Sequence, residues 1–255
     1  MVPLLLTAVL LFVSALADEP CPARCLCSPV AVICNGAALP TIPVLPSYAA
    51  SLLLNRNSIT SLPANAFPGA PQLASMQIAF NRITFVHRDA LAGLPLLSDL
   101  LISNNAITEF PAGFFDHVPL LSALDFTSNA VTRFPAFPPR MQNMSVIYAS
   151  RNQISSISRA DLAPVAATIL TLSLHLNLLG PVNGGQGIPA DLFADCRQLS
   201  AVMFSSNDLT TLPDELFAPV QHTLNSVALH DNKLTVLPAS LLRTIAMGSL
   251  RSMCV

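Results

Sequence analysis

One asparagine recurs at a nearly constant interval through most of this 255-residue chain. The intervals between its eight positions are 24, 24, 24, 23, 25, 30 and 25 residues. Periods in this range are typical of solenoids, in which a unit too small to bury its own apolar face stacks on its neighbours. The chain is therefore expected to form a stack of similar turns around a ladder of Asn57, Asn81, Asn105, Asn129, Asn152, Asn177, Asn207 and Asn232.

The apolar residues around each asparagine follow a fixed pattern, L-x-x-L-x-L-x-x-N-x-L, which ends in x-x-L-P or x-x-F-P. The weakest copies are led by Ala49 and Met144, and one complete copy is Leu97, Leu100, Ile102, Asn105, Ile107, Phe110 and Pro111. The pattern resembles the leucine-rich repeat family over nearly all of the mature chain. The resemblance implies an α/β-type solenoid, or horseshoe, with a parallel β-sheet on its concave face and a mostly irregular or short helical convex side.

The alternation within each copy is that of a short strand with one buried face, so the leucine positions point inward and the x positions outward. Each asparagine follows its strand, where the chain turns. Its side chain has both donors and an acceptor, which can satisfy backbone groups left unpaired by the turn. Asn104, directly beside Asn105, is expected to face solvent and to tolerate substitution.

The composition fits a continuous apolar core and no charged partner surface. Hydrophobic residues make up 52% of the chain and charged residues 10%, and the net charge is -2. No basic face is therefore expected, which argues against nucleic acid or anionic lipid as a partner.

The first residues indicate targeting. The apolar stretch from Leu4 to Leu16 is too short to span a bilayer comfortably, and small residues precede position 18. We expect a signal peptide over residues 1–17, cleaved after Ala17, although no Lys or Arg precedes the apolar run. The alternative is a buried N-terminal strand or helix.

Four clustered cysteines, Cys21, Cys25, Cys27 and Cys34, follow this segment. Four cysteines allow three pairings, and their spacing does not choose among them. They resemble the N-terminal cap of extracellular leucine-rich repeat proteins, which implies pairs 21 with 27 and 25 with 34, in a cap over residues 18–48. Zinc is the rival interpretation of clustered cysteines, but no histidine is nearby.

Two further cysteines are expected to remain unbonded to each other. Cys196 is placed on the convex side of the seventh repeat and Cys254 in a ninth strand, about two repeats away. Each is predicted to be a free thiol or a half-cystine awaiting a partner.

The repeats are expected over residues 49–255, as eight clear copies and a partial ninth to which we assign Leu241, Leu242, Ile245, Met247 and Leu250. No C-terminal cap sequence and no membrane-spanning stretch follow Asn232. This predicts an exposed last turn with possible self-association, in either a short secreted form or a piece of a longer receptor.

Three irregular features interrupt the repeats. The segment from Gly180 to Gly187 accounts for the 30-residue interval and indicates a surface loop, either a contact finger or a tolerated insertion. The proline-rich segment 134–139 should be extended rather than helical. A glycosylation sequon begins at Asn143, although Ser145 already starts a strand.

No catalytic motif or metal-ligand spacing occurs in the sequence, so we expect no enzyme, no cofactor and no metal. Asp99 and Asp125 are on adjacent predicted strands but in different columns, which disfavours a catalytic carboxylate pair.

The outward positions of the strands remain as candidates for ligand binding. Most are small, and against that background Tyr148, Arg151, His175 and Met203 form a group on the fifth to seventh strands. The alternative is a solvated face without a partner. The full set of candidate ligand-binding residues is Arg56, Phe80, Asp99, Asp125, Tyr148, Arg151, His175, Met203 and His230.

These features predict a secreted protein that recognises a protein ligand without catalysis. The family resemblance implies roles that range from immune recognition to adhesion, guidance and matrix organisation. The alternatives are a self-associating matrix protein and the truncated ectodomain of a receptor.

Overall fold

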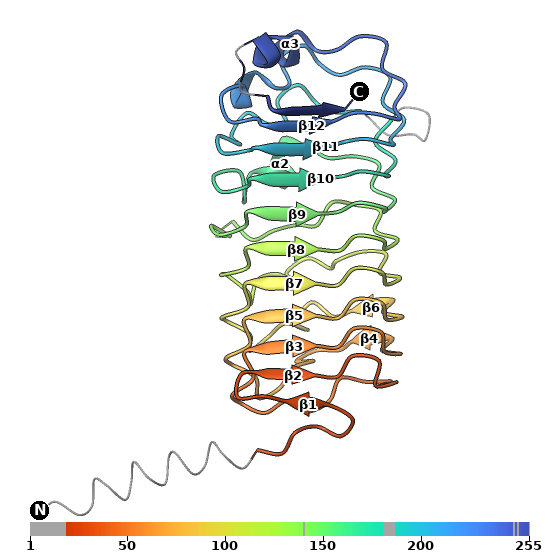
Figure 1. Ribbon diagram of the computed structural model, residues 1–255, viewed down its shortest axis with the longest axis vertical. Helices are drawn as coiled ribbons and strands as arrows, with labels where there is room; N and C mark the ends of the chain where they lie inside the picture. Colours follow the sequence, from red (N-terminus) through yellow and green to blue (C-terminus); the bar gives the residue numbers. More distant parts are fainter. Residues whose placement is uncertain (1–18, 140, 181–186, 247, 249, 255) are drawn as a thin grey trace, which may run out of the picture.

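The computed structural model describes residues 19–139, 141–180, 187–246, 248 and 250–254. They form a parallel β solenoid whose main sheet has eleven strands in the order β1-β2-β3-β5-β7-β8-β9-β10-β11-β12-β13 (Figure 1). The predicted fold class is confirmed. The expected signal segment 1–17 lies outside the described residues, and so do residues 181–186 of the glycine-rich segment.

All strands are short. The main sheet contains β1 (Leu26–Cys27), β2 (Ala31–Ile33), β3 (Ser51–Leu53), β5 (Ser75–Gln77), β7 (Asp99–Leu101), β8 (Ala123–Asp125), β9 (Val146–Tyr148), β10 (Thr171–Ser173), β11 (Ala201–Met203), β12 (Ser226–Ala228) and β13 (Ser252–Cys254). A second sheet pairs β4 (Ser61–Leu62) with β6 (Phe85–Val86). The helical elements are α2 (Arg159–Leu162), the 3-10 helix η2 (Ala218–Val220) and α3 (Ala239–Ala246). Among the described residues, no helix is long and apolar enough to cross a membrane.

The strands pair in register, so that equivalent residues of successive repeats lie side by side. Leu100, the middle residue of β7, pairs with Met76 on one side and with Leu124 on the other. These middle residues are fully buried, whereas the residues that flank them face outward. The period-2 pattern thus orients each strand by burying its central side chain.

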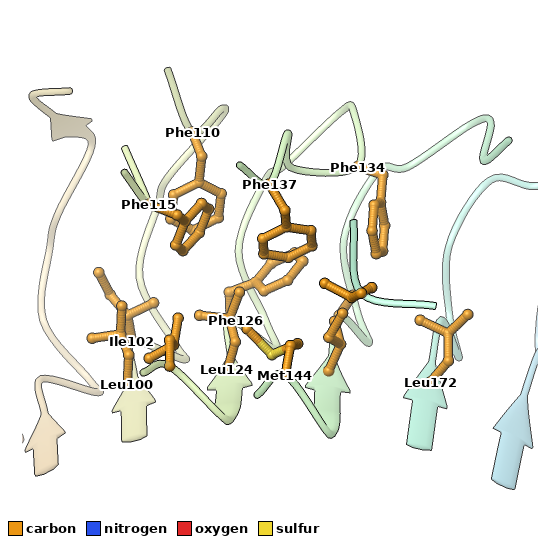
Figure 2. Close-up of a cluster of buried hydrophobic side chains, with 14 of the residues drawn as sticks. Leu100, Ile102, Phe110, Phe115, Leu124, Phe126, Phe134, Phe137, Met144 and Leu172 are labelled. Atoms are coloured by element: carbon orange, nitrogen blue, oxygen red, sulfur yellow. The ribbon is translucent and has the colours of Figure 1, made fainter. Parts of the chain in front are cut away.

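Phenylalanines fill the core between the sheet and the opposite connections. Figure 2 shows the rings of Phe110, Phe115 and Phe137 farther from the strands than Leu100 and Leu124. Ring centroids are 5.6 Å apart for Phe110 and Phe115 and 5.1 Å apart for Phe115 and Phe137, in tilted arrangements. Residues 131–139 form no helix, as expected from their prolines, and this segment directs Phe137 into the core.

The asparagines form a hydrogen-bonded ladder through the stack. The amide nitrogen of Asn105 donates to the carbonyl oxygens of Ile102 and Ser103 in its own turn, at 3.1 and 3.2 Å, and to that of Ile78 in the preceding repeat, at 3.1 Å. Its Oδ1 accepts from the backbone N–H of Ile83, also in the preceding repeat, at 3.0 Å. Each such asparagine thus closes its own turn and joins it to the turn before.

At the N-terminal end, one disulfide joins Cys21 to Cys27 and the other joins Cys25 to Cys34, the same pairs that the family resemblance implies. The hairpin β1–β2 is antiparallel, and β2 then pairs in parallel with β3. The carbonyl oxygen of Cys34 also accepts from Asn57 Nδ2 at 2.8 Å, so this cysteine contacts the first asparagine of the ladder. The disulfide-bonded segment is therefore continuous with the repeats.

The segment assigned to a ninth repeat is mostly helical instead. Leu241, Leu242 and Ile245 lie in α3, in the connection that follows β12, and Met247 is outside the described residues. The apolar spacing here has helical periodicity, and Leu241 is buried while Leu242 is exposed. A ninth strand does follow, because β13 pairs in parallel with β12.

Gly180 begins the irregular segment for a steric reason. A Cβ atom at this position would lie 2.0 Å from the backbone carbonyl oxygen of Asp208 in the next repeat. Only glycine allows the two backbones to approach so closely. This fact explains the first glycine of the segment, while residues 181–186 are outside the described part of the chain.

Cys196 and Cys254 are both free thiols. Cys196 is buried in the connection between β10 and β11, and burial raises the pKa of its thiol to about 12. Cys254 is exposed on β13. The two free thiols should therefore differ in reactivity, since the thiolate is the nucleophile.

We expect iodoacetamide at pH 8 to modify Cys254 and to leave Cys196 unmodified in the folded protein. At that pH, a thiol with a pKa of about 12 is ionised in only about one molecule in ten thousand. Mass spectrometry of tryptic peptides measures both positions, and labelling in denaturant provides the control in which both should react. Equal rates at the two cysteines in the folded protein would contradict the burial of Cys196.

Candidate functional site

The outward side chains of the main sheet form a surface that we call the sheet face. It consists of the first and third residues of the main-sheet strands β3, β5 and β7 to β13, together with the residue that precedes each ladder asparagine. The third residues lie in one column because the strands pair in register. This column is Leu53, Gln77, Leu101, Asp125, Tyr148, Ser173, Met203, Ala228 and Cys254.

The residue before each ladder asparagine has a left-handed backbone conformation, which the sequence did not indicate because none of these residues is glycine. Their φ angles range from 51° to 59°. The backbone N–H of Phe80 donates to the carbonyl oxygen of Ser103 in the next repeat at 3.1 Å, and this bond helps to hold the unusual conformation. These positions are Arg56, Phe80, Asn104, Ser128, Arg151, Leu176, Ser206 and Asp231.

The position two residues before each asparagine is less exposed than predicted. Ala79, Ser103 and Ser205 are buried, because the turn that begins here brings neighbouring repeats into contact. The expectation that this whole column faces solvent was therefore wrong. His175 and His230, in the same column, are half-buried.

Tyr148 and Arg151 are exposed on the sheet face, as predicted, while Met203 is half-buried there. The Tyr148 side chain is 42% exposed. In the strand register Tyr148 lies beside Ser173, and Ser173 lies beside Met203. Two large side chains of this column thus flank the small, buried Ser173.

His175 and His230 lie two repeats apart on either side of Ser205. Nδ1 of His175 is 2.8 Å from Oγ of Ser205, and the two imidazole centroids are 6.2 Å apart. Nδ1 of His230 is buried without a hydrogen-bond partner among the described residues. Its Nε2 lies 3.9 Å from Asp231 Oδ2. The two histidines and Ser205 thus form a polar group at the turns that follow β10 to β12.

The two sheet carboxylates do not form a pair. Asp99 is in the first column, where Ser98 Oγ donates to it at 2.5 Å, and Asp125 is in the third column, where it accepts from the backbone N–H of Thr127. Within the part of the chain that the structure describes, no group of three His, Cys, Asp or Glu side chains could hold a metal ion.

Carboxylates with shifted pKa values lie in the connections, away from the sheet face. A hydrogen bond from His117 lowers the pKa of Asp89, and one from Arg159 lowers the pKa of Asp195. Arg159 binds Asp195 with two nitrogens, at 2.7 and 3.1 Å. These exposed pairs join neighbouring connections, and their exposure gives them little of the character of a catalytic site.

Comparison with known proteins agrees with this architecture. A family model described as leucine rich repeat matches residues 48–107. Human platelet glycoprotein IX is 35% identical over 74 residues, which are 27% of this chain and 42% of that protein. Peroxidasin of Drosophila melanogaster is 40% identical over 72 residues, which are 28% of this chain and 5% of that protein. The match thus spans less than half the length of either relative.

A solved structure shares the fold over almost the whole length. The crystal structure of human 5T4 (Wnt-activated inhibitory factor 1, trophoblast glycoprotein) superimposes with a TM-score of 0.72 and 20% sequence identity, and 92% of each chain is covered. Two disulfides near residues 21–34 also suit the N-terminal cap of such proteins. The recurring motif, the asparagine ladder, the family match over residues 48–107 and the shared fold show that the chain folds as a leucine-rich repeat solenoid.

Proposed function

We propose that this protein is secreted and recognises a protein ligand, without catalysis, through its sheet face. The two disulfides support an oxidising compartment, and the apolar residues 4–16 support entry into the secretory pathway. A glycan on Asn143 would fit the same route, because this side chain is exposed and precedes β9.

The observation that supports this function best is the group of large side chains on and beside β9 to β11, around the small Ser173. Tyr148, Arg151 and Met203 project from a rigid sheet whose other third-column residues here, Ser173 and Ala228, are small. Tyrosine and arginine often dominate the free energy of protein binding, and a sheet holds them with little loss of conformational entropy on binding.

We expect Tyr148→Ala combined with Arg151→Ala to weaken ligand binding by about 2 kcal/mol or more, which is roughly thirtyfold. The melting temperature should stay nearly unchanged, because both side chains lie outside the core. A ligand captured from the native medium and surface plasmon resonance provide the measurement.

The matched control is Arg133→Ala. Arg133 is also exposed, lies in the connection after β8 and forms no ion pair among the described residues. Arg159→Ala would be a poorer control, because it removes the contact with Asp195. Unchanged affinity in the double variant would place the ligand elsewhere, and the segment 180–187 would then be deleted as the next test. Light scattering that shows growth into large assemblies would instead favour a matrix protein.

A further inference from the structure

A second feature of the sheet face is a hollow at its N-terminal end, about 530 Å³ in volume. Side chains from four successive turns line it, which places it on β3, β5 and β7 and the corners beside them. Its volume is in the range of small-ligand sites. The polar and aromatic lining residues are Asn35, Asn55, Arg56, Gln77, Phe80 and Ser103.

The amide groups of this hollow have orientations that their hydrogen bonds determine. Oδ1 of Asn35 accepts from the backbone N–H of Asn55 at 2.9 Å, and Oδ1 of Asn55 accepts from the backbone N–H of Ala79 at 2.8 Å. Because only an oxygen can accept these bonds, the NH2 group of Asn55 points the other way. It donates to Oε1 of Gln77 at 3.0 Å.

This chain of amides leaves donors without partners. The oxygens of Asn35, Asn55 and Gln77 are all occupied, while the NH2 groups of Asn35 and Gln77 have no hydrogen-bond partner among the described residues. Each NH2 group has two N–H bonds to donate. The hollow therefore offers several N–H donors.

Arg56 adds a positive charge at the same place. Its guanidinium carbon lies 5.5 Å from the centroid of the Phe80 ring, and it forms no ion pair within the described part of the chain. This cation–π contact keeps the guanidinium near the hollow, and its N–H groups make no ion pair that would compete with a planar anion. Phe80 is itself 51% exposed, so the pair of Arg56 and Phe80 is accessible to solvent at the edge of the hollow.

The neighbouring carboxylates do not neutralise this charge. Asp99 is bonded to Ser98, and Asp125 lies one strand beyond Leu101 and accepts from its own turn. A single arginine among neutral amide donors matches one carboxylate, which accepts two parallel hydrogen bonds from guanidinium. A sulfated glycan needs several cations in a row, and the whole chain has only 12 Lys and Arg residues.

We infer that this hollow binds an Asp or Glu side chain of the protein partner, with Arg56 as the main contact and the NH2 groups of Gln77 and Asn35 as further donors. The inference rests on the proposed function, since it adds a second contact region to the same sheet face. It gives the partner an acidic residue opposite the N-terminal repeats.

The test uses the intact mature chain labelled with 15N and a blocked tetraglutamate peptide. We expect the peptide to shift the side-chain signals of Arg56 Nε–H and Gln77 NH2, and tetraglutamine to shift neither. Arg56→Gln should weaken tetraglutamate binding by about tenfold or more. Phe80→Leu, which retains a side-chain type found at the equivalent position 176, should weaken it less.

Arg133→Gln is the control, because it removes an exposed arginine outside the sheet face and should leave the affinity unchanged. Equal affinity for tetraglutamine, or no effect of Arg56→Gln in a variant that melts like the parent, would overturn the inference. Tighter binding of a sulfated heparin tetrasaccharide at these signals would overturn the choice of a protein carboxylate. These outcomes need no natural partner, so they are separate from any failure of the Tyr148 and Arg151 variants.

Discussion

Replacing Cys25 and Cys34 together with alanine should lower the free energy of unfolding by about 2 to 5 kcal/mol. This disulfide joins Cys25, which directly precedes the β1–β2 hairpin, to Cys34, which directly follows it. Cys34 is buried and contacts Asn57 of the first repeat. Without the link, the unfolded chain gains conformational freedom, and the hairpin covers the apolar end of the stack less firmly. Equilibrium unfolding in urea measures the loss.

Two controls define the cause. Cys254→Ser changes an exposed thiol that has no disulfide partner, and it should leave the urea midpoint unchanged. Replacing Cys21 and Cys27 should cost less than replacing Cys25 and Cys34, because Cys21 is exposed whereas Cys34 is buried. A double variant at 25 and 34 with the stability of the parent would contradict a structural role for the cap. Free thiols or bound zinc in peptide mapping of the mature chain would contradict the disulfides themselves.

Asn105→Leu should destabilise the protein by about 3 kcal/mol even though it adds apolar surface. The substitution removes four hydrogen bonds. The N–H of Ile83 loses its partner, and the carbonyl oxygens of Ile78 and Ile102 each lose one of two donors and keep the amide of the neighbouring ladder asparagine. These groups lie inside the turn, where water cannot easily replace the amide. Denaturant titration monitored by circular dichroism measures the change.

Asn104→Leu is the matched control for the ladder. The side chain of Asn104 makes no hydrogen bond among the described residues, but its φ angle is 54°, a conformation that asparagine adopts more readily than leucine. We therefore expect a loss of about 1 kcal/mol at position 104 rather than none. Leu176 occupies the equivalent position with the same φ, so the fold accommodates leucine there. If the two variants lost similar amounts of unfolding free energy, the special role of Asn105 in the ladder would be contradicted.

The sequence by itself determined the stack. Each repeat buries the middle residue of its strand and satisfies its turn with its own asparagine, and both requirements recur within about 24 residues. Such local and periodic constraints can be recognised from the sequence alone. The short strands, the ladder and the separation of Asp99 from Asp125 followed from them. The helix α3 did not, because its apolar residues suited either a helix or a further repeat.

The details of the sheet face depended on the tertiary structure, because they are set by residues 20 to 30 positions apart. Arg56 stacks on Phe80 only because adjacent turns place both at left-handed corners, and no glycine indicates these corners in the sequence. Backbone N–H groups of neighbouring turns determine the direction of the Asn35 and Asn55 amides, and the NH2 group of Asn55 then determines that of Gln77. The free donors of Asn35 and Gln77 follow from these contacts. Likewise, packing between connections, and not its neighbours in sequence, buries Cys196 and raises the pKa of its thiol.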